Sequence, residues 1–273
     1  MSRDTGTQRP VAFFDSGVGG LPYLEVAKRL LPGERYIYLA DRAGFPYGAK
    51  TRQEIVGLSL RALAELAIAH RPKAVVVACN TASAAALSEL RKAHANLPIV
   101  GTVPAIKPAA QGSRAKRVGL VATAAATRDP YVLDLVERWA GDCRVVLRGD
   151  QDLVRFVEDQ LFKATHAERL AAVRPSVDAM KAEGVDAIVL GCTHFLYLAS
   201  EFAEVSGPGV RIIDSRDGVI AQLRRVLAAG PGLADNRPDG PDLMYLTGPD
   251  PFGDKYASFA ARFGLEPAGS LYA

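Results

Sequence analysis

Two cysteines in this chain follow segments of nearly the same character. Cys79 comes directly after the apolar run 74–78, and Cys192 comes directly after the apolar run 187–191. Such runs are typical of buried parallel strands, and α/β proteins bind their ligands just beyond the carboxyl ends of these strands. Either cysteine alone is most simply a buried structural thiol. As a pair, they could remove a proton from one face of a carbon atom and deliver a proton to its other face.

Polar residues follow each of the two cysteines. Asn80 and Thr81 come after the first and offer hydrogen bonds to a carboxylate, and the free backbone amides of a helix that opens here would favour a thiolate. Thr193 and His194 come after the second, and the imidazole could hydrogen-bond the sulfur or an ionisable group of a substrate. A lone histidine is more often structural, but the repeated strand-end cysteine favours a function here.

Two loops carry further candidate groups. The segment Asp15–Gly20 reads DSGVGG and follows the strand-like run 11–14, so its glycines could let backbone amides approach an anion, with Asp15 orienting a catalytic group. A tight turn leading into a helix explains the same glycines, and the spacing is not that of a dinucleotide-binding fingerprint. Phe45–Gly48, which reads FPYG after Asp41, could supply a tyrosine hydroxyl and backbone amides, although a simple turn is the commoner explanation of such a segment.

Strand-like and helix-like segments alternate along the chain, which predicts an α/β fold with parallel sheets. Apolar runs predict strands at 11–14, 35–39, 74–78, 99–101, 118–122, 143–147, 187–191, 211–214 and 243–247. Helical periodicity predicts helices at 19–31, 51–69, 82–95, 130–140, 152–162, 167–183, 218–229 and 251–263. We expect two similar α/β lobes with an active site in the cleft between them. The first lobe is expected to contain residues 1–98 and 210–273, and the second residues 99–209.

Composition narrows the class of protein. The 273 residues are 49% hydrophobic and 23% charged, which predicts a packed core, and the net charge of +3 gives no support for a nucleic-acid or anionic-membrane partner. No apolar run is long enough to predict a membrane span, and the polar segment Met1–Pro10 lacks the apolar core expected of a signal peptide. Three cysteines and four histidines favour a reducing compartment and no metal site. We therefore expect a cytoplasmic protein.

Taken together, these motifs resemble glutamate racemases of the cofactor-independent Asp/Glu racemase superfamily. The resemblance rests on five segments in the family's order: FDSGVGGL at 14–21, PYG at 46–48, ACNTA at 78–82, VPA at 103–105 and LGCTHF at 190–195. Histidine after Cys192-Thr193 favours glutamate racemases, since aspartate racemases tend to carry glutamate there. The resemblance implies racemisation of L-glutamate to D-glutamate for peptidoglycan, with no pyridoxal phosphate or other cofactor and with the free amino acid as the small-molecule partner. A homodimer is implied by the resemblance alone.

The resemblance also implies roles for individual residues. Cys79 and Cys192 would be the two acid–base thiols, the first assisted by Asp15 and the second by His194. Glu158 is similar to a further acidic residue that the family carries near its site. The groups that would hold the substrate's carboxylates and ammonium are Asp15, Ser16, Tyr47, Gly48, Asn80, Thr81, Thr193 and His194.

Two positions depart from the family pattern. Leu196 stands where the family usually has proline after GCTHF, which would alter the loop behind the histidine without removing a chemical group. Asp129-Pro130 stands where relatives often carry a serine, which puts loop contacts of the second lobe in doubt.

Other functions remain open on the sequence alone. A thiol hydrolase or redox enzyme would use Cys192 as a nucleophile with His194 as its base, but it leaves the matching Cys79 segment unexplained. A two-lobed binding protein would hold glutamate without exchanging its α-proton. Aspartate racemase, hydantoin racemase and an activity like that of arylmalonate decarboxylase are the alternatives within the superfamily.

Overall fold

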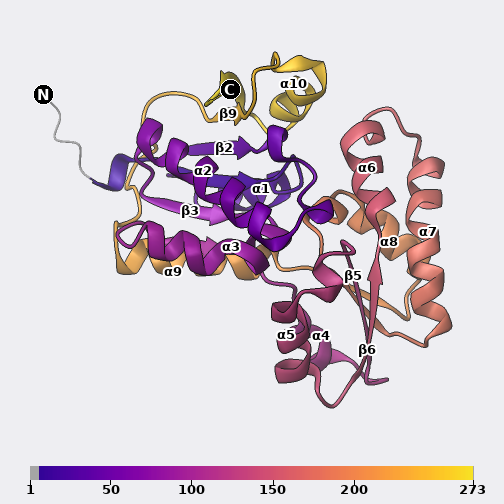
Figure 1. The fold of residues 1–273 in the computed structure, drawn as a ribbon. Coiled ribbons are helices and arrows are strands. Elements are labelled where there is room, and N and C mark those ends of the chain that lie inside the picture. The colour runs from indigo at the N-terminus through magenta and orange to yellow at the C-terminus, as the bar shows by residue number, and fades with distance from the viewer. Residues whose placement is uncertain (1–5, 273) are drawn as a thin grey trace, which may run out of the picture. The chain divides into compact units, whose positions relative to one another are not determined.

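The computed structural model describes residues 6–272, which form two compact units, each built around its own β-sheet (Figure 1). The first unit comprises the chain up to Thr102 and from Arg216 onward, and the second comprises Val103–Ser215. Within the described residues, no helix is long and apolar enough to cross a lipid bilayer.

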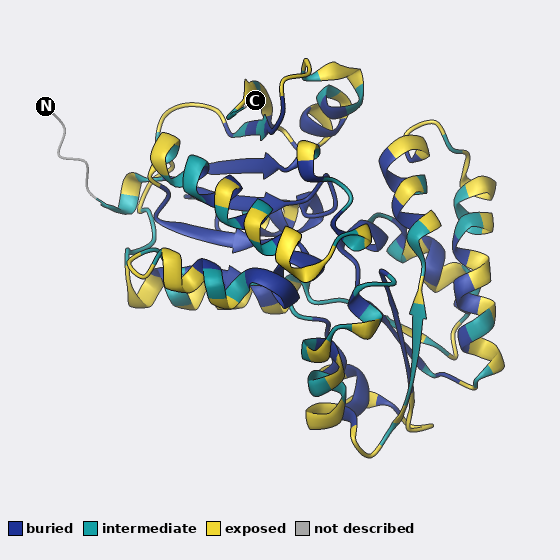
Figure 2. Ribbon diagram, viewed as in Figure 1, coloured by how far each residue is buried: buried dark blue, intermediate teal, exposed yellow. Residues whose placement is uncertain are grey.

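The first unit contains a six-stranded sheet in the order β10-β9-β2-β1-β3-β4, with every neighbouring pair parallel. Its strands are β1 (Val11–Asp15), β2 (Tyr36–Ala40), β3 (Ala74–Val77), β4 (Ile99–Gly101), β9 (Leu243–Leu246) and β10 (Glu266–Ser270). Every residue of β1, β2 and β3 is buried, as Figure 2 shows by the dark blue of these strands. Burial on both faces is the condition under which parallel strands read as unbroken apolar runs.

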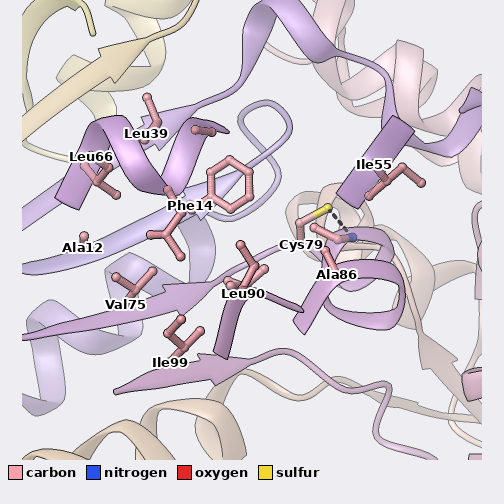
Figure 3. Packing of buried hydrophobic residues seen from close by; sticks show 14 of the residues in the cluster. Ala12, Phe14, Leu39, Ile55, Leu66, Val75, Cys79, Ala86, Leu90 and Ile99 are labelled. Carbon is pink, nitrogen blue, oxygen red and sulfur yellow. Dashed lines mark hydrogen bonds between the residues drawn. The ribbon is translucent and has the colours of Figure 1, made fainter. Parts of the chain in front are cut away.

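Helices cover both faces of this sheet. The helices are α1 (Leu21–Leu30), α2 (Arg52–His70), α3 (Asn80–Ala93), α9 (Arg216–Ala229) and α10 (Gly253–Arg262). Alternate strand residues, among them Phe14 and Val75, pack with residues of α2 and α3 in one apolar cluster (Figure 3). Side chains alternate along a strand, so the residues between them face the other side, where α1 packs beside α9.

The second unit contains a four-stranded parallel sheet in the order β6-β5-β7-β8. Its strands are β5 (Arg117–Ala122), β6 (Arg144–Gly149), β7 (Ala187–Leu190) and β8 (Arg211–Ile213). Its helices are α4 (Ile106–Gly112), α5 (Pro130–Ala140), α6 (Gln151–Gln160), α7 (His166–Ala182) and α8 (Ala199–Ser206), and a short 3₁₀ helix, η5 (Thr193–Leu198), follows β7. The α/β class with two parallel sheets, expected from the sequence, is confirmed.

The expected lobe boundaries at 98/99 and 209/210 each assign an edge strand to one lobe, but that strand pairs with the sheet of the other unit. Ile99–Gly101 pairs with β3 of the first unit, and Arg211–Ile213 pairs with β7 of the second. Each edge strand belongs to the sheet with which its backbone N–H and C=O groups form hydrogen bonds. Two α-helices, α4 and α8, and one strand, β10, are absent from the sequence prediction.

Candidate active site

The turn between β1 and α1 is held from the neighbouring strand. Asp15, at the end of β1, is fully buried and accepts a hydrogen bond from the Gly17 N–H at 2.6 Å. The Tyr38 hydroxyl donates to the Gly17 carbonyl at 2.9 Å and accepts from the Gly20 N–H at 3.1 Å. A Cβ on Gly20 would lie 2.7 Å from Cβ of Ala78, so glycine allows the turn to approach the end of β3. The sequence analysis did not identify Tyr38, whose signal is a hydroxyl within an apolar strand.

Cys79 lies at the junction of β3 and α3, where it occupies the N-cap position. It is 5% exposed, and its Sγ accepts from the Ala82 N–H at 3.4 Å (Figure 3). The Ser16 Oγ lies 3.7 Å from the sulfur. Burial and the negative charge of Asp15 raise the pKa of this thiol, and together they outweigh the hydrogen bonds that lower it. The hydrogen bond from the helix amide thus acts in the expected direction, but burial and the charge of Asp15 favour the neutral thiol.

Asn80 and Thr81 lie inside the first turn of α3, and both side chains are buried. The sequence analysis expected the helix to begin near residue 82, two residues later than it does. The earlier start places these two polar side chains at the amino end of the helix, beside Cys79. Backbone amides at this end carry partial positive charge and favour a bound anion.

Tyr47 lies in the same buried cluster as Cys79, and its ring packs edge-on against Phe14 with 6.5 Å between ring centroids. Its hydroxyl donates to Oδ2 of Asp41 at 2.5 Å. Burial and the charge of Asp41 raise the pKa of Tyr47, so the phenol is neutral. Gly48 follows in the same 3₁₀ turn and is half-buried. The structure therefore brings this loop to the first thiol.

The second cysteine is placed by a glycine at the end of β7. The Gly191 N–H donates to the Val121 carbonyl at 2.7 Å, which continues the strand pairing by one residue. A Cβ on Gly191 would lie 2.5 Å from Cδ1 of Leu120, so a larger residue here would displace the Leu120 side chain. Cys192 then leaves the sheet edge at the start of η5 and is 6% exposed.

A buried chain of ionisable groups follows Cys192. The His194 Nδ1 lies 3.8 Å from the Cys192 Sγ, and its Nε2 lies 2.9 Å from Oε1 of Glu158 on α6. All three side chains are nearly inaccessible to solvent. Burial lowers the pKa of His194, but the hydrogen bonds and charges of Cys192 and Glu158 outweigh it and raise this pKa well above its usual value. The structure thus joins Glu158 to a histidine 36 residues away in the chain.

The two departures from the family pattern have structural roles. Asp129 is the N-cap of α5, where its Oδ1 accepts from the Tyr131 N–H at 2.9 Å, and Pro130 occupies the first turn, which suits proline. Leu196 is buried within η5. Neither residue removes a polar group from the series of contacting side chains that links Cys192 through His194 to Glu158.

The expected site residues fall into two groups, one in each unit. The first unit carries Asp15, Ser16, Tyr47, Gly48, Cys79, Asn80 and Thr81, and the second carries Glu158, Cys192, Thr193 and His194. Each group combines a buried thiol at a strand end with an acid or a base of its own. Among the described residues, no group of three or more histidine, cysteine, aspartate or glutamate side chains could hold a metal ion.

The two parallel α/β units match a family of racemases. Residues 23–223 match the family described as Asp/Glu/Hydantoin racemase. A glutamate racemase of a Shewanella species (strain MR-4) is 40% identical over 220 residues, which cover 81% of this chain and 80% of that protein. The chain therefore belongs to the Asp/Glu/Hydantoin racemase family and is an isomerase.

Solved structures agree with this assignment. The chain is similar to the crystal structure of Escherichia coli glutamate racemase in complex with L-glutamate and the activator UDP-MurNAc-ala, with a TM-score of 0.86 and 31% identity over 97% of this chain and 98% of that one. It is also similar to a glutamate racemase isoform from Bacillus anthracis, with a TM-score of 0.83 and 26% identity over 96% and 97% of the two chains.

Proposed function

We propose that this chain interconverts L- and D-glutamate without a cofactor, using Cys79 and Cys192 as its two acid–base groups. The observation that carries the proposal is the repeated arrangement of a buried strand-end thiol with its own partner, Asp15 in one unit and His194 in the other. The substrate is argued from relatives named glutamate racemase and from the E. coli relative, whose crystal structure contains L-glutamate.

In the proposed reaction, the two sulfur atoms address opposite faces of one α-carbon. One sulfur, as thiolate, takes the α-proton, so that an S–H bond forms and the electron pair of the C–H bond moves into the α-carboxylate. The opposite thiol gives its proton to the other face, which forms the new C–H bond and leaves a thiolate there. Exchanging the two roles converts the other enantiomer. A single base could not serve both faces without moving the substrate.

Each thiol has a neighbour that can take up or return its proton. Cys79 is held neutral by burial and by the charge of Asp15, so it must lose a proton before it acts as a base, and we assign Asp15 as the acceptor. The His194 Nδ1 is 3.8 Å from the second sulfur and would exchange a proton with it. Glu158 would hold the imidazole in place and balance its charge.

The remaining site residues would bind the substrate and stabilise the intermediate. Proton removal places negative charge on the α-carboxylate, and preorganised hydrogen-bond donors lower the energy of such charge. The groups to which we assign this role are Ser16, Tyr47, Gly48, Asn80, Thr81 and Thr193. Asn80 and Thr81 support the assignment because they lie at the amino end of α3, where the backbone favours an anion.

Circular dichroism of L-glutamate incubated with the purified protein alone tests the activity. We expect the signal to decay to zero as the racemic mixture forms, while L-aspartate under the same conditions keeps its signal. Addition of pyridoxal phosphate should leave the rate unchanged. An unaltered glutamate signal, or a rate that requires the added cofactor, would refute the proposal. Trapping of a covalent acyl or mixed-disulfide intermediate would favour a thiol hydrolase or redox enzyme instead.

We further propose that the D-glutamate supplies peptidoglycan synthesis in the cytoplasm and that the active form is a homodimer. These assignments follow from the family resemblance. Growth of a D-glutamate-requiring bacterium on expression of the chain tests the first assignment. Light scattering of the purified protein tests the second, and a monomer that retains full activity would contradict it.

A further inference from the structure

The C-terminal part of the chain is fastened to the loop that carries Tyr47. This loop, residues 41–48, is called the tyrosine loop here, and residues 247–251, which follow β9, are called the return loop. The Arg42 guanidinium donates to four backbone carbonyls of the return loop: Thr247 and Gly248 at 3.2 Å each, Asp250 at 2.8 Å and Pro251 at 2.7 Å. One side chain thus joins two loops that are about two hundred residues apart in sequence.

Thr247, which is fully buried, makes a second connection between the same two loops. Its hydroxyl donates to Oδ1 of Asp41 at 2.6 Å and accepts from the Ala43 N–H at 3.0 Å. The other oxygen, Oδ2 of Asp41, accepts the Tyr47 hydroxyl at 2.5 Å. A continuous line of hydrogen bonds therefore runs from the end of β9 through one carboxyl group to the tyrosine beside Cys79.

The chemistry of these groups fixes the direction of each bond. A carboxylate can only accept, so both hydroxyls must donate to Asp41. The proton of Tyr47 consequently points towards Asp41. Without the Thr247 hydroxyl, Oδ1 of Asp41 would keep the Gly44 N–H at 3.3 Å, a longer contact. A buried carboxylate oxygen that loses its short partner is poorly satisfied, which costs free energy, so we expect Asp41 to reorient and Tyr47 to move with it.

We propose that Thr247 is a positioning residue of the active site, acting through Asp41 to hold Tyr47 against Cys79. The residue lies beyond residues 23–223, which match the family, and its hydrogen bond to Asp41 joins the C-terminal segment to the tyrosine loop. The effect on substrate binding depends on the proposed function. The shielding of Cys79 from solvent does not depend on the proposed function, because Tyr47 and Cys79 lie in the same buried cluster of the protein without substrate.

The test compares Thr247→Val, which removes the hydroxyl at nearly constant shape, with Thr247→Ser, which keeps it. Ser270→Ala is the matched control, because the Ser270 hydroxyl donates to the Gly248 carbonyl at 2.6 Å and does not bond to Asp41. The first readout is the rate at which iodoacetamide alkylates Cys79 in the free protein, followed by peptide mass spectrometry. Alkylation of Cys143 serves as the internal reference.

We expect Thr247→Val to raise the Cys79 alkylation rate about tenfold relative to Cys143, since a hydrogen bond to a charged group is lost. Thr247→Ser and Ser270→Ala should stay within about twofold of the wild type. The second readout is kinetic: the KM for L-glutamate should rise about tenfold in Thr247→Val with little change in kcat, because Tyr47 would contact substrate and transition state alike.

Unchanged Cys79 alkylation in folded Thr247→Val would overturn the proposal, whatever the kinetics show. If Cys79 of the wild type is alkylated as expected but the protein does not racemise glutamate, the proposed function fails. The alkylation rates of Cys79 in the variants then decide the role of Thr247 on their own. If Thr247→Val does not fold, Thr247→Ala removes the same hydroxyl with a smaller side chain. It should then raise the Cys79 alkylation rate, and an unchanged rate in that variant would equally overturn the proposal.

Discussion

The two buried thiols have neighbours of opposite kinds. Cys79 has the carboxylate of Asp15 nearby, which raises the pKa of its thiol, whereas Cys192 lies beside His194, whose own pKa is raised. A carboxylate and an imidazole carry opposite charges in their ionised forms. The proposed reaction therefore starts from two unlike halves, and each half should respond differently to pH and to substitution.

Replacing either thiol tests the two-base reaction at the level of single residues. Cys79→Ser or Cys192→Ser should lower kcat by about 10²–10⁴-fold in both directions, because a hydroxyl is a far weaker acid than a thiol and cannot serve as the second base. Initial rates from L- and from D-glutamate, measured by circular dichroism, check this. Cys143→Ser is the control, since this half-buried thiol has no acid or base of the site beside it, and it should keep full activity. A Cys79 or Cys192 variant with wild-type turnover in either direction would contradict the reaction.

The bond between His194 and Glu158 predicts a pH-dependent stability. The pKa of His194 is raised in the folded protein, so its favourable contribution is complete below the unfolded pKa of about 6.5 and is lost as pH rises through the folded value. Glu158→Gln should therefore lower the melting temperature most near pH 6 and progressively less towards alkaline pH. Glu183→Gln, which removes a surface pair with Arg144, should cause a small and nearly constant loss. A difference between Glu158→Gln and the wild type that grows with pH would contradict the assignment.

At the level of elements, Gly20→Ala tests how closely the turn before α1 approaches the end of β3, and Gly57→Ala is its control. Gly20→Ala places a Cβ 2.7 Å from Cβ of Ala78, so it should destabilise the protein by about 1–3 kcal/mol. Gly57→Ala meets no atom within 4 Å in the middle of α2, and should stabilise it by about 0.5–1 kcal/mol. Urea unfolding of both variants checks the pair. Equal effects of the two substitutions would show that the turn has room for a side chain.

Some elements follow from the sequence, and others cannot be predicted from it. The strands β1, β3 and β7 are short apolar runs buried on both faces, a pattern that predicts them within one residue. The start of α3 is misplaced because its N-cap is Cys79, and sequence rules expect serine, threonine, aspartate or asparagine there. The strand β10 is largely exposed at the sheet edge and contains Pro267 and Gly269, so its residues read as a turn.

The candidate site shows the same division between local and distant contacts. Neighbours along the chain, such as Cys192 and His194, can be read as a unit because the backbone keeps them close. The bond between Thr247 and Asp41 spans 206 residues and depends on β9 returning to pair with β2, which no local pattern encodes. Glu158 was suggested only by the resemblance, and its bond to the imidazole emerges from the packing of α6 on η5.

At the level of the whole molecule, a buried ion pair holds distant parts of the chain to the first unit. The Lys73 Nζ is inaccessible to solvent and contacts the Glu34 carboxylate at 2.7 Å, the Thr7 carbonyl at 2.6 Å and the Gly232 carbonyl at 3.1 Å. The Glu34 carboxylate also accepts from the Ala234 N–H at 3.0 Å. One pair thus joins the segment before β1 to the segment that leads back to β9.

Removing one partner of this pair should be more harmful than removing both. Lys73→Met leaves the charge of Glu34 buried without its cation and should cost about 3–5 kcal/mol of folding free energy. Lys73→Met combined with Glu34→Gln should recover part of that loss. Lys92→Met, which removes a surface pair with Glu89, should cost less than about 1 kcal/mol. Urea unfolding of the three proteins gives the comparison, and a double variant less stable than Lys73→Met would contradict the account.

The most direct test of the two-thiol reaction follows the α-hydrogen of L-glutamate in deuterated water during the first few per cent of turnover. If one sulfur removes the proton and the opposite sulfur supplies another, the D-glutamate formed must carry solvent deuterium at Cα, because the donating thiol has exchanged with solvent. Mass spectrometry of the separated enantiomers should show the label in nearly all of the product. Product D-glutamate that retains the original hydrogen would contradict a reaction with two opposed acid–base groups.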